Sequence, residues 1–413
     1  MNLLSKDNKL EIFFCLSFSV WMLIGYLRSH GWLGYNIFYS IIQMVFLLWG
    51  LKSFFQTNRM NKISKIMTAF IAYILLSGIS YFYNDRPASC YTDALLHFVM
   101  PMLAFYCGVS TKNKDGFILI IGSSATIMLV LCLFSYFTLS PRYLNFINEA
   151  RLEKASGLDE YTLNHLRFSA ISGSAYFVMY LCAPLLAYYL CNLFINGKRT
   201  IIYIVTTAVL VISLIFCQQR TAILFVGLAF IYYLLFSNFK NKIPYILFIV
   251  TIFVGLYYLG TKGGRFSVIM ELVLDRASSM TFSEAFGERE DQVFEVFKYW
   301  NNIIIGDGVG VYSHEAFYNG FTSVRDNGWI KILVENGIIG IAFFVIIISM
   351  SLKHALLRDK HKIAEVLIII FYMIAMIGSN SLSMLFFYSI FFWYAIGGIW
   401  NENNVINLIN NKK

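Results

Sequence analysis

Long runs of apolar residues, separated by short polar segments, dominate the chain from end to end. A helix that crosses about 30 Å of hydrocarbon needs about 20 mainly apolar residues. Twelve runs meet this requirement, some of them only with tilting or with their flanking residues. They lie at 10–27, 32–51, 66–83, 93–110, 117–139, 168–191, 201–217, 221–237, 243–260, 328–350, 363–380 and 383–400. The pattern therefore predicts an all-α polytopic membrane protein with about 12 transmembrane helices.

The composition excludes a soluble enzyme and a disordered chain. Hydrophobic residues make up 58% of the 413 positions, aromatic residues 18% and charged residues 13%. A soluble domain carries about 25% charged residues, and disordered chains are poor in aromatic ones. The formal net charge of +9 does not indicate nucleic-acid binding, because the cations lie mostly in short loops between apolar runs. Positive residues in such loops report the orientation of the spans.

Lysine and arginine are divided between the two predicted sides of the membrane. With the N-terminus in the cytoplasm, lysine predominates in the inner loops, as the positive-inside rule requires. An even number of spans then places the C-terminal tail, which ends in Lys412 and Lys413, in the cytoplasm too. Ten arginines fall on the outer side: Arg28, Arg86, Arg142, Arg151, Arg167, Arg220, Arg265, Arg276, Arg289 and Arg325. A guanidinium binds phosphate or carboxylate through two parallel hydrogen bonds, so these arginines either pair with outer carboxylates or form an external site for a phosphorylated substrate.

Two predicted outer segments are long enough to carry chemistry. The apolar runs divide the chain into 1–260 with nine spans, a large outer loop at 261–327, and 328–413 with three spans and a cytoplasmic tail. A shorter outer loop, 140–167, interrupts the first part. Apolar residues recur at helical spacing near 266–274 and 288–302. This spacing predicts short amphipathic helices that pack on the bundle or lie at the membrane surface.

The end of the large loop and the tenth span hold the candidate acids and bases. Gly306, Gly308 and Gly310 alternate with other residues, which permits tight turns and close backbone approach. The candidates that follow are His314, Asp326 and Glu335. A carboxylate inside a span, such as Glu335, is costly and indicates either a functional role or an internal ion pair, for which Lys331 is the nearest partner in sequence. His97 and Pro101, in the fourth span, are assigned a structural role.

The motifs of residues 306–340 resemble those of the O-antigen polymerase and ligase superfamily. Gly306-Asp307-Gly308 is similar to its G-x-G turn, Asn327-Gly328-Trp329 to its N-G-aromatic stretch, and Glu335-Asn336-Gly337-Ile338-Ile339-Gly340 to its E-x-G-I-x-G helix end. The ligase branch has a histidine where this chain has Arg325, which favours the polymerase branch. Looser matches are Gln219-Arg220-Thr221-Ala222 to the family's S-R-x-A, Arg289 to the arginine that opens its outer helix, and Arg276 with Gly287 to an R-x10-G spacing.

The resemblance implies a GT-C-like glycosyltransferase, of hexosyltransferase type, that polymerises a bacterial surface polysaccharide such as O-antigen. Such enzymes transfer the growing glycan from undecaprenyl pyrophosphate onto a new lipid-linked repeat unit at the periplasmic face of the inner membrane. The family uses no nucleotide sugar, metal or other cofactor. Its implied partners are undecaprenyl-pyrophosphate-linked repeat units, membrane lipid, a chain-length regulator and a flippase, and not nucleic acid. An O-antigen ligase and a lipid-linked oligosaccharide flippase are the alternatives, and a capsule or an exopolysaccharide is an alternative product.

A pyrophosphate leaving group and a hydroxyl acceptor assign roles to the candidate residues. Negative charge develops on the pyrophosphate as its bond to the sugar breaks, and fixed guanidinium groups stabilise that charge. The predicted pyrophosphate- and glycan-binding residues are Arg220, Arg289, Arg325, Arg276, Arg265, Arg167 and Asn327. The base that takes the proton of the acceptor must lie within hydrogen-bond reach; His314, Asp326 and Glu335 are the predicted catalytic residues.

Overall fold

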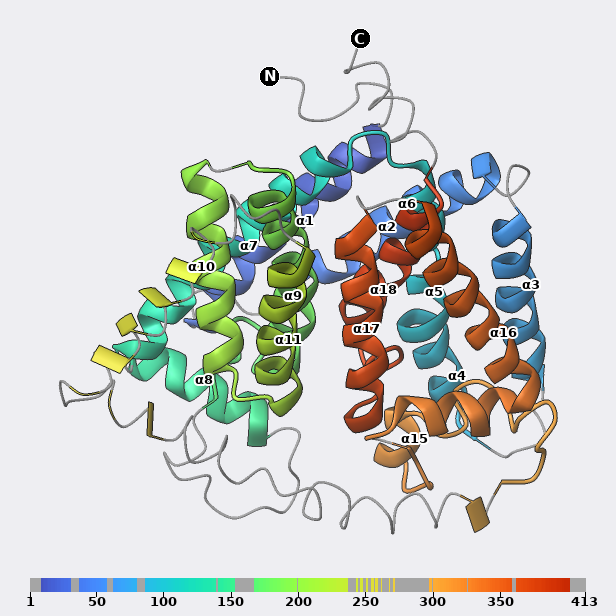
Figure 1. The fold of residues 1–413 in the computed structure, drawn as a ribbon. Helices are drawn as coiled ribbons and strands as arrows, with labels where there is room; N and C mark the ends of the chain where they lie inside the picture. Colours follow the sequence, from blue (N-terminus) through green and yellow to red (C-terminus); the bar gives the residue numbers. More distant parts are fainter. Residues whose placement is uncertain are drawn as a thin grey trace. The chain divides into compact units, whose positions relative to one another are not determined.

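The computed structural model describes residues 9–30, 37–57, 62–79, 86–138, 140–152, 167–198, 200–236, 300–324, 326–358 and 362–401, with single positions between 243 and 298. Every regular element in these residues is a helix (Figure 1). The all-α class is thus confirmed for the described part of the chain. The residues form two compact units, Met1–Val45 with Asn113–Met280 and Phe46–Lys112 with Thr281–Lys413. The division falls inside helix α2, Ile37–Thr57.

The first unit is built on a contact between helices from distant parts of the sequence. Its helices are α1 (Lys9–Ser29), α7 (Lys114–Phe137), α8 (Pro141–Leu152), α9 (Ala175–Leu190) with the π-helical turn η4 (Cys191–Ile195), α10 (Ile201–Phe216) and α11 (Arg220–Phe236). Helix α1 packs on α7, and α10 packs on both α9 and α7. Helix α8 lies where the sequence predicts only an outer loop. Its few apolar residues leave no span-like run to predict from, and Pro141 at its first turn supplies a helical φ angle.

The second unit surrounds helix α18. Its helices are α3 (Lys62–Ser77), α4 (Ala88–Ala94), η2 (Leu95–Val99), α5 (Met100–Met102), α6 (Ala104–Ser110), α15 (His314–Tyr318), α16 (Gly328–Arg358), α17 (Ile363–Gly378) and α18 (Phe386–Ile399). Helix α18 packs on α5, α6, α16 and α17. Two glycines bring the backbones of α6 and α18 into contact, since a Cβ on Gly108 would meet Tyr394 O and one on Gly397 would meet Phe105 O.

Six helices among the described residues are long and apolar enough to cross a membrane. They are Lys9–Ser29, Ile37–Thr57, Ala88–Ser110, Lys114–Phe137, Ala175–Ile195 and Gly328–Leu356. Four shorter apolar helices, α10, α11, α17 and α18, coincide with further predicted spans. The predicted span 243–260 and the two predicted amphipathic helices lie largely outside the described residues. The structure therefore supports a helical membrane protein, and the count of twelve spans stays a prediction.

Two predicted spans are interrupted by residues with special backbone chemistry. In the fourth span the chain widens into the π-helical turn η2 directly before Pro101. Proline has no N–H and its ring clashes with the carbonyl group four residues earlier, so a wider turn relieves the helix. In the tenth span Gly337 has φ 65° and ψ −171°, which breaks α16 in its first half. The predicted span 328–350 thus lies within the candidate membrane span Gly328–Leu356, and the break at Gly337 inside it was not predicted.

Candidate functional site

The end of the large loop is inserted into the break in α16. In an uninterrupted helix the carbonyl groups of Val334 and Glu335 would accept hydrogen bonds from residues four positions later. Here these two carbonyl groups accept hydrogen bonds from amides of the loop, and the amides that follow the break donate hydrogen bonds to carbonyl groups of the loop. The four bonds are Asp307 N to Val334 O (2.9 Å), Gly308 N to Glu335 O (2.9 Å), Ile338 N to Ile303 O (3.0 Å) and Ile339 N to Ile304 O (3.2 Å). The loop thus satisfies backbone groups that the break would leave without partners.

Glycine is required on both sides of this insertion. Gly306 has φ 78°, and a Cβ there would lie 2.5 Å from Asn336 N. A Cβ on Gly337 would lie 2.5 Å from Gly306 N. The hydroxyl group of Tyr73, on α3, closes the junction at 2.7 Å from Asn336 O and 3.0 Å from Ile305 O. The G-x-G turn and the E-x-G motif are therefore two halves of one structure, which we call the loop–helix junction.

Asp307 holds the loop of this junction in shape. Its carboxylate is 3% exposed and accepts hydrogen bonds from Asn301 N (3.1 Å), Asn302 N (2.9 Å) and the Tyr312 hydroxyl (2.6 Å). Burial raises the pKa of Tyr312, and the hydrogen bond to Asp307 raises it further. Asp307 therefore organises the loop, and the neutral Tyr312 hydroxyl group donates a hydrogen bond to its carboxylate.

Glu335 joins the same loop to α16 through its side chain. The carboxyl group is 2% exposed, and its Oε1 accepts a hydrogen bond from Tyr312 N at 3.1 Å. The Lys331 Nζ atom lies 3.9 Å from the same oxygen and is also buried. The ion pair that the sequence offered as the alternative role of Glu335 is thus present. Removing either partner of a buried pair leaves an uncompensated charge, so both residues are important to the junction whatever else they do.

The other candidates from the large loop lie at helix starts. His314 is the first residue of α15 and is half-buried; the preceding Ser313 caps that helix, its Oγ accepting from Ala316 N at 3.2 Å. Asn327 caps α16, with its Oδ1 accepting from Ile330 N at 3.0 Å. Asp326 precedes it and is half-buried. The structure gives Asn327 a structural role, while its predicted contact with substrate stays a prediction, as do the catalytic roles of His314, Asp326 and Glu335.

Two of the predicted arginines lie near the same turn of the first unit. Arg220 is the first residue of α11, directly after the turn that follows α10. The amide of Phe168 donates to Phe216 O at 3.0 Å, which fixes the segment that begins at Arg167 against the end of α10. The charge of Arg167 accordingly interacts with Cys217. The first unit therefore places Arg167 beside the turn that carries Arg220. Four other predicted arginines, Arg265, Arg276, Arg289 and Arg325, lie outside the described residues.

A polar pair in the fourth span is the feature that sequence reasoning missed. The His97 Nε2 atom lies 3.5 Å from Asp93 Oδ1, and the side chains are 15% and 25% exposed. The amide of Phe386, at the start of α18, donates to His97 Nδ1 at 3.0 Å. The charge of Lys331 interacts with both residues. The spacing of four residues within one span was visible in the sequence, but the contact with α18 was not.

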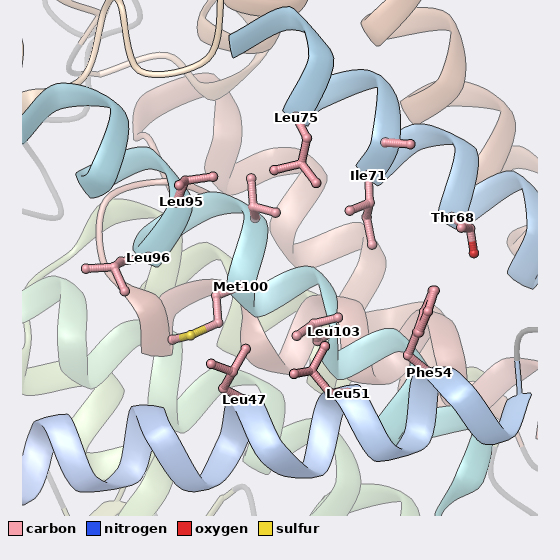
Figure 2. Close-up of a pocket in the computed structure, with 12 residues that line it drawn as sticks. Leu47, Leu51, Phe54, Thr68, Ile71, Leu75, Leu95, Leu96, Met100 and Leu103 are labelled. Atoms are coloured by element: carbon pink, nitrogen blue, oxygen red, sulfur yellow. The ribbon is translucent and has the colours of Figure 1, made fainter. Parts of the chain in front are cut away.

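An apolar cavity of about 480 Å³ lies in the second unit, between α2, α3 and residues 95–103 (Figure 2). Its wall includes Leu51 and Phe54 from α2, Leu75 from α3 and Met100 from α5. Thr68 supplies the one hydroxyl group among the lining side chains. Such a surface suits a hydrocarbon chain and not a sugar or a phosphate, which would lose hydrogen bonds to water there.

No family model, curated protein or solved structure matches this chain. Within the described residues there is also no group of three or more His, Cys, Asp or Glu side chains that could hold a metal ion. The basis for a functional conclusion is therefore the geometry of the second unit together with the resemblance of residues 306–340.

Proposed function

We propose that this protein is a polymerase of a bacterial surface polysaccharide, embedded in the inner membrane with both termini in the cytoplasm. It transfers an undecaprenyl-pyrophosphate-linked glycan onto a new lipid-linked repeat unit at the periplasmic face. The observation that carries the proposal is the loop–helix junction. The motifs at 306–310 and 335–340 lie in direct backbone contact. The resemblance alone gives only the order in which these motifs follow each other in the sequence. Three polar side chains, Asp93, His97 and Lys331, lie beside this junction.

The reaction needs groups that stabilise a leaving pyrophosphate. Fixed guanidinium groups do this without reorganising as the charge develops, and we assign the role to the predicted arginines, with Arg220 first. Because a lysine cannot form the two parallel hydrogen bonds of a guanidinium, Arg220→Lys is expected to lose polymer nearly as completely as Arg220→Ala. Full chain length in the lysine variant, measured on a polysaccharide gel, would contradict bidentate binding by Arg220.

The apolar cavity supports a lipid-linked substrate. It lies between helices of the second unit, and its wall includes Leu95 and Leu96, which share the η2 turn with His97. At the other wall Leu75 lies two residues from Ser77, whose hydroxyl is 3.5 Å from Asn336 Oδ1 at the break in α16. A hydrocarbon chain in the cavity would therefore end near the polar residues of the junction. We assign the cavity to part of the isoprenoid chain.

A gel of the lipopolysaccharide from a strain that lacks the gene tests the function. A strain with an empty vector is expected to show lipid A–core that carries a single repeat unit, and the wild-type gene is expected to restore the ladder of long chains. Core without any repeat would identify a ligase or a flippase instead. An unchanged ladder would exclude O-antigen as the product, and the same comparison is then made on capsule and exopolysaccharide.

A further inference from the structure

We propose that Asp93 is the general base that accepts the proton of the acceptor hydroxyl group, and that His97 positions its carboxylate. The inference rests on the proposed function, since it names the base of that reaction. Asp93 lies in α4, and none of the predicted bases, His314, Asp326 and Glu335, belongs to that helix.

The hydrogen bond from Phe386 determines the protonation state of His97. A backbone amide can only donate, so His97 Nδ1, 3.0 Å from Phe386 N, must carry a lone pair. The ring is then neutral, and its proton is on Nε2, which faces Asp93 Oδ1 at 3.5 Å. A charged ring would place a second N–H against the Phe386 amide. His97 therefore orients an ionised Asp93 without taking its place as the base.

Asp93 is more accessible than the two carboxylates of the junction itself. Glu335 is 2% exposed and Asp307 is 3% exposed, and both accept hydrogen bonds from loop residues. Asp93 is 25% exposed, and its Oδ2 accepts no hydrogen bond from the described residues. A carboxylate that is partly exposed and held in place is what proton transfer from a bound hydroxyl requires.

Gly310, in the loop of the junction, packs directly on α4, the helix that carries Asp93. A Cβ on Gly310, which has φ 90°, would lie 3.0 Å from Ala94 Cβ and 2.5 Å from Cys90 O. Helix α15 also packs on α4, and the charges of Glu315 and Lys331 interact with Asp93. The last glycine of the G-x-G-x-G segment thus brings the outer loop against the helix that bears the base.

The glycosyl transfer with Asp93 as base needs no co-reactant, since every bond and proton is accounted for. The acceptor hydroxyl oxygen forms a bond to the anomeric carbon of the donor, and its proton passes to Asp93 Oδ2. The bond between that carbon and the pyrophosphate oxygen breaks, and undecaprenyl pyrophosphate leaves with the electron pair. Asp93 then releases the proton to water before the next cycle.

The test compares purified full-length variants that use lipid-linked repeat units extracted from the strain lacking the gene. Asp93→Asn preserves shape and keeps an oxygen beside His97, but it cannot take a proton. Its kcat is expected to fall at least about 100-fold, the lower range for general-base catalysis, with KM and Tm unchanged. Asp115→Asn, the same exchange at an exposed ion pair with Lys198, is the matched control and is expected to keep wild-type kcat.

Two further variants separate catalysis from folding. Asp93→Glu keeps a carboxylate and is expected to be faster than Asp93→Asn; equal rates would overturn the proposal. His97→Asn keeps an acceptor for Phe386 and is expected to lower kcat without changing KM. In the Asp93→Asn background the same change should have no further effect on kcat, because a positioning residue acts only through the base.

The outcomes distinguish this inference from the proposed function. If the wild-type protein polymerises the repeat units and Asp93→Asn does so at the same rate, Asp93 is not the base and the polymerase assignment stands. If the wild-type protein itself forms no polymer, the proposed function fails and the inference fails with it. Additive effects of Asp93→Asn and His97→Asn on kcat would overturn the positioning role of His97.

Discussion

Gly337 has a backbone conformation that residues with side chains rarely adopt, at φ 65° and ψ −171°. The space at this position is also occupied, because a Cβ would meet Ile304 O and Gly306 N. Helix α16 breaks here, and loop residues 303–308 contact it through backbone atoms. A single glycine therefore decides whether the loop–helix junction can form.

Gly337→Ala is expected to destabilise the protein by about 1–3 kcal/mol or more, the cost of one strained residue, because the backbone clash adds to the strain. The measurement is the Tm of the purified protein in detergent. Gly227→Ala, on the exposed face of α11 with no atom within 4 Å of the added Cβ, is the control and is expected to leave Tm unchanged or slightly higher. Equal Tm values for Gly337→Ala and the wild type would contradict the geometry of the break.

Tyr312 gives the junction a dependence on pH. Its pKa is raised by burial and by its hydrogen bond to Asp307, so the folded state favours the neutral phenol. The stabilisation from Tyr312 is fully present below the ordinary tyrosine pKa of about 10 and is lost as the pH rises towards the folded value. The Tm difference between wild type and Tyr312→Phe is therefore expected to be constant up to about pH 10 and to shrink above it. A difference that grows with pH would contradict the shift.

At the scale of the elements, the cavity between α2, α3 and η2 offers a matched pair of variants. Ala72 and Ala69, one turn apart on α3, are both exposed, but only Ala72 lines the cavity. Ala72→Phe is expected to fill the space and to shorten the polysaccharide ladder by excluding part of the isoprenoid chain. Ala69→Phe is expected to leave the ladder unchanged. Identical ladders from both variants would remove the cavity from the proposed substrate path.

The sequence predicts where most of these helices lie but not where they are interrupted. Apolar runs of sufficient length identify the helices because hydrocarbon imposes that length. The π turn follows locally from Pro101, but the bond between its His97 and Phe386 and the break at Gly337 against Ile304 depend on residues far away in sequence. The G-x-G turn and Glu335 belong to a continuous motif, so they could be recognised from the sequence. The Asp93–His97 pair could not be recognised as a candidate site, because its surroundings come from distant residues.

At the scale of the whole molecule, the proposed reaction requires a particular orientation of α16. The residues before this helix, with His314 and Asp326, must lie on the periplasmic side, and its C-terminal end must lie in the cytoplasm. Tyr318 before the helix is 60% exposed, and Lys353 near its end is exposed as well. All seven natural cysteines are buried, so the wild-type chain gives a low background for thiol labelling.

Labelling with a membrane-impermeant maleimide tests this orientation. Tyr318→Cys is expected to react in intact spheroplasts, because α16 begins on the outer side in the predicted topology. Lys353→Cys is expected to react only after the membrane is permeabilised, because lysine-rich loops face the cytoplasm. The unmodified chain is the control for background. The reverse pattern would place the loop–helix junction and Asp93 on the cytoplasmic side, where a polymerase of periplasmic lipid-linked units could not use them.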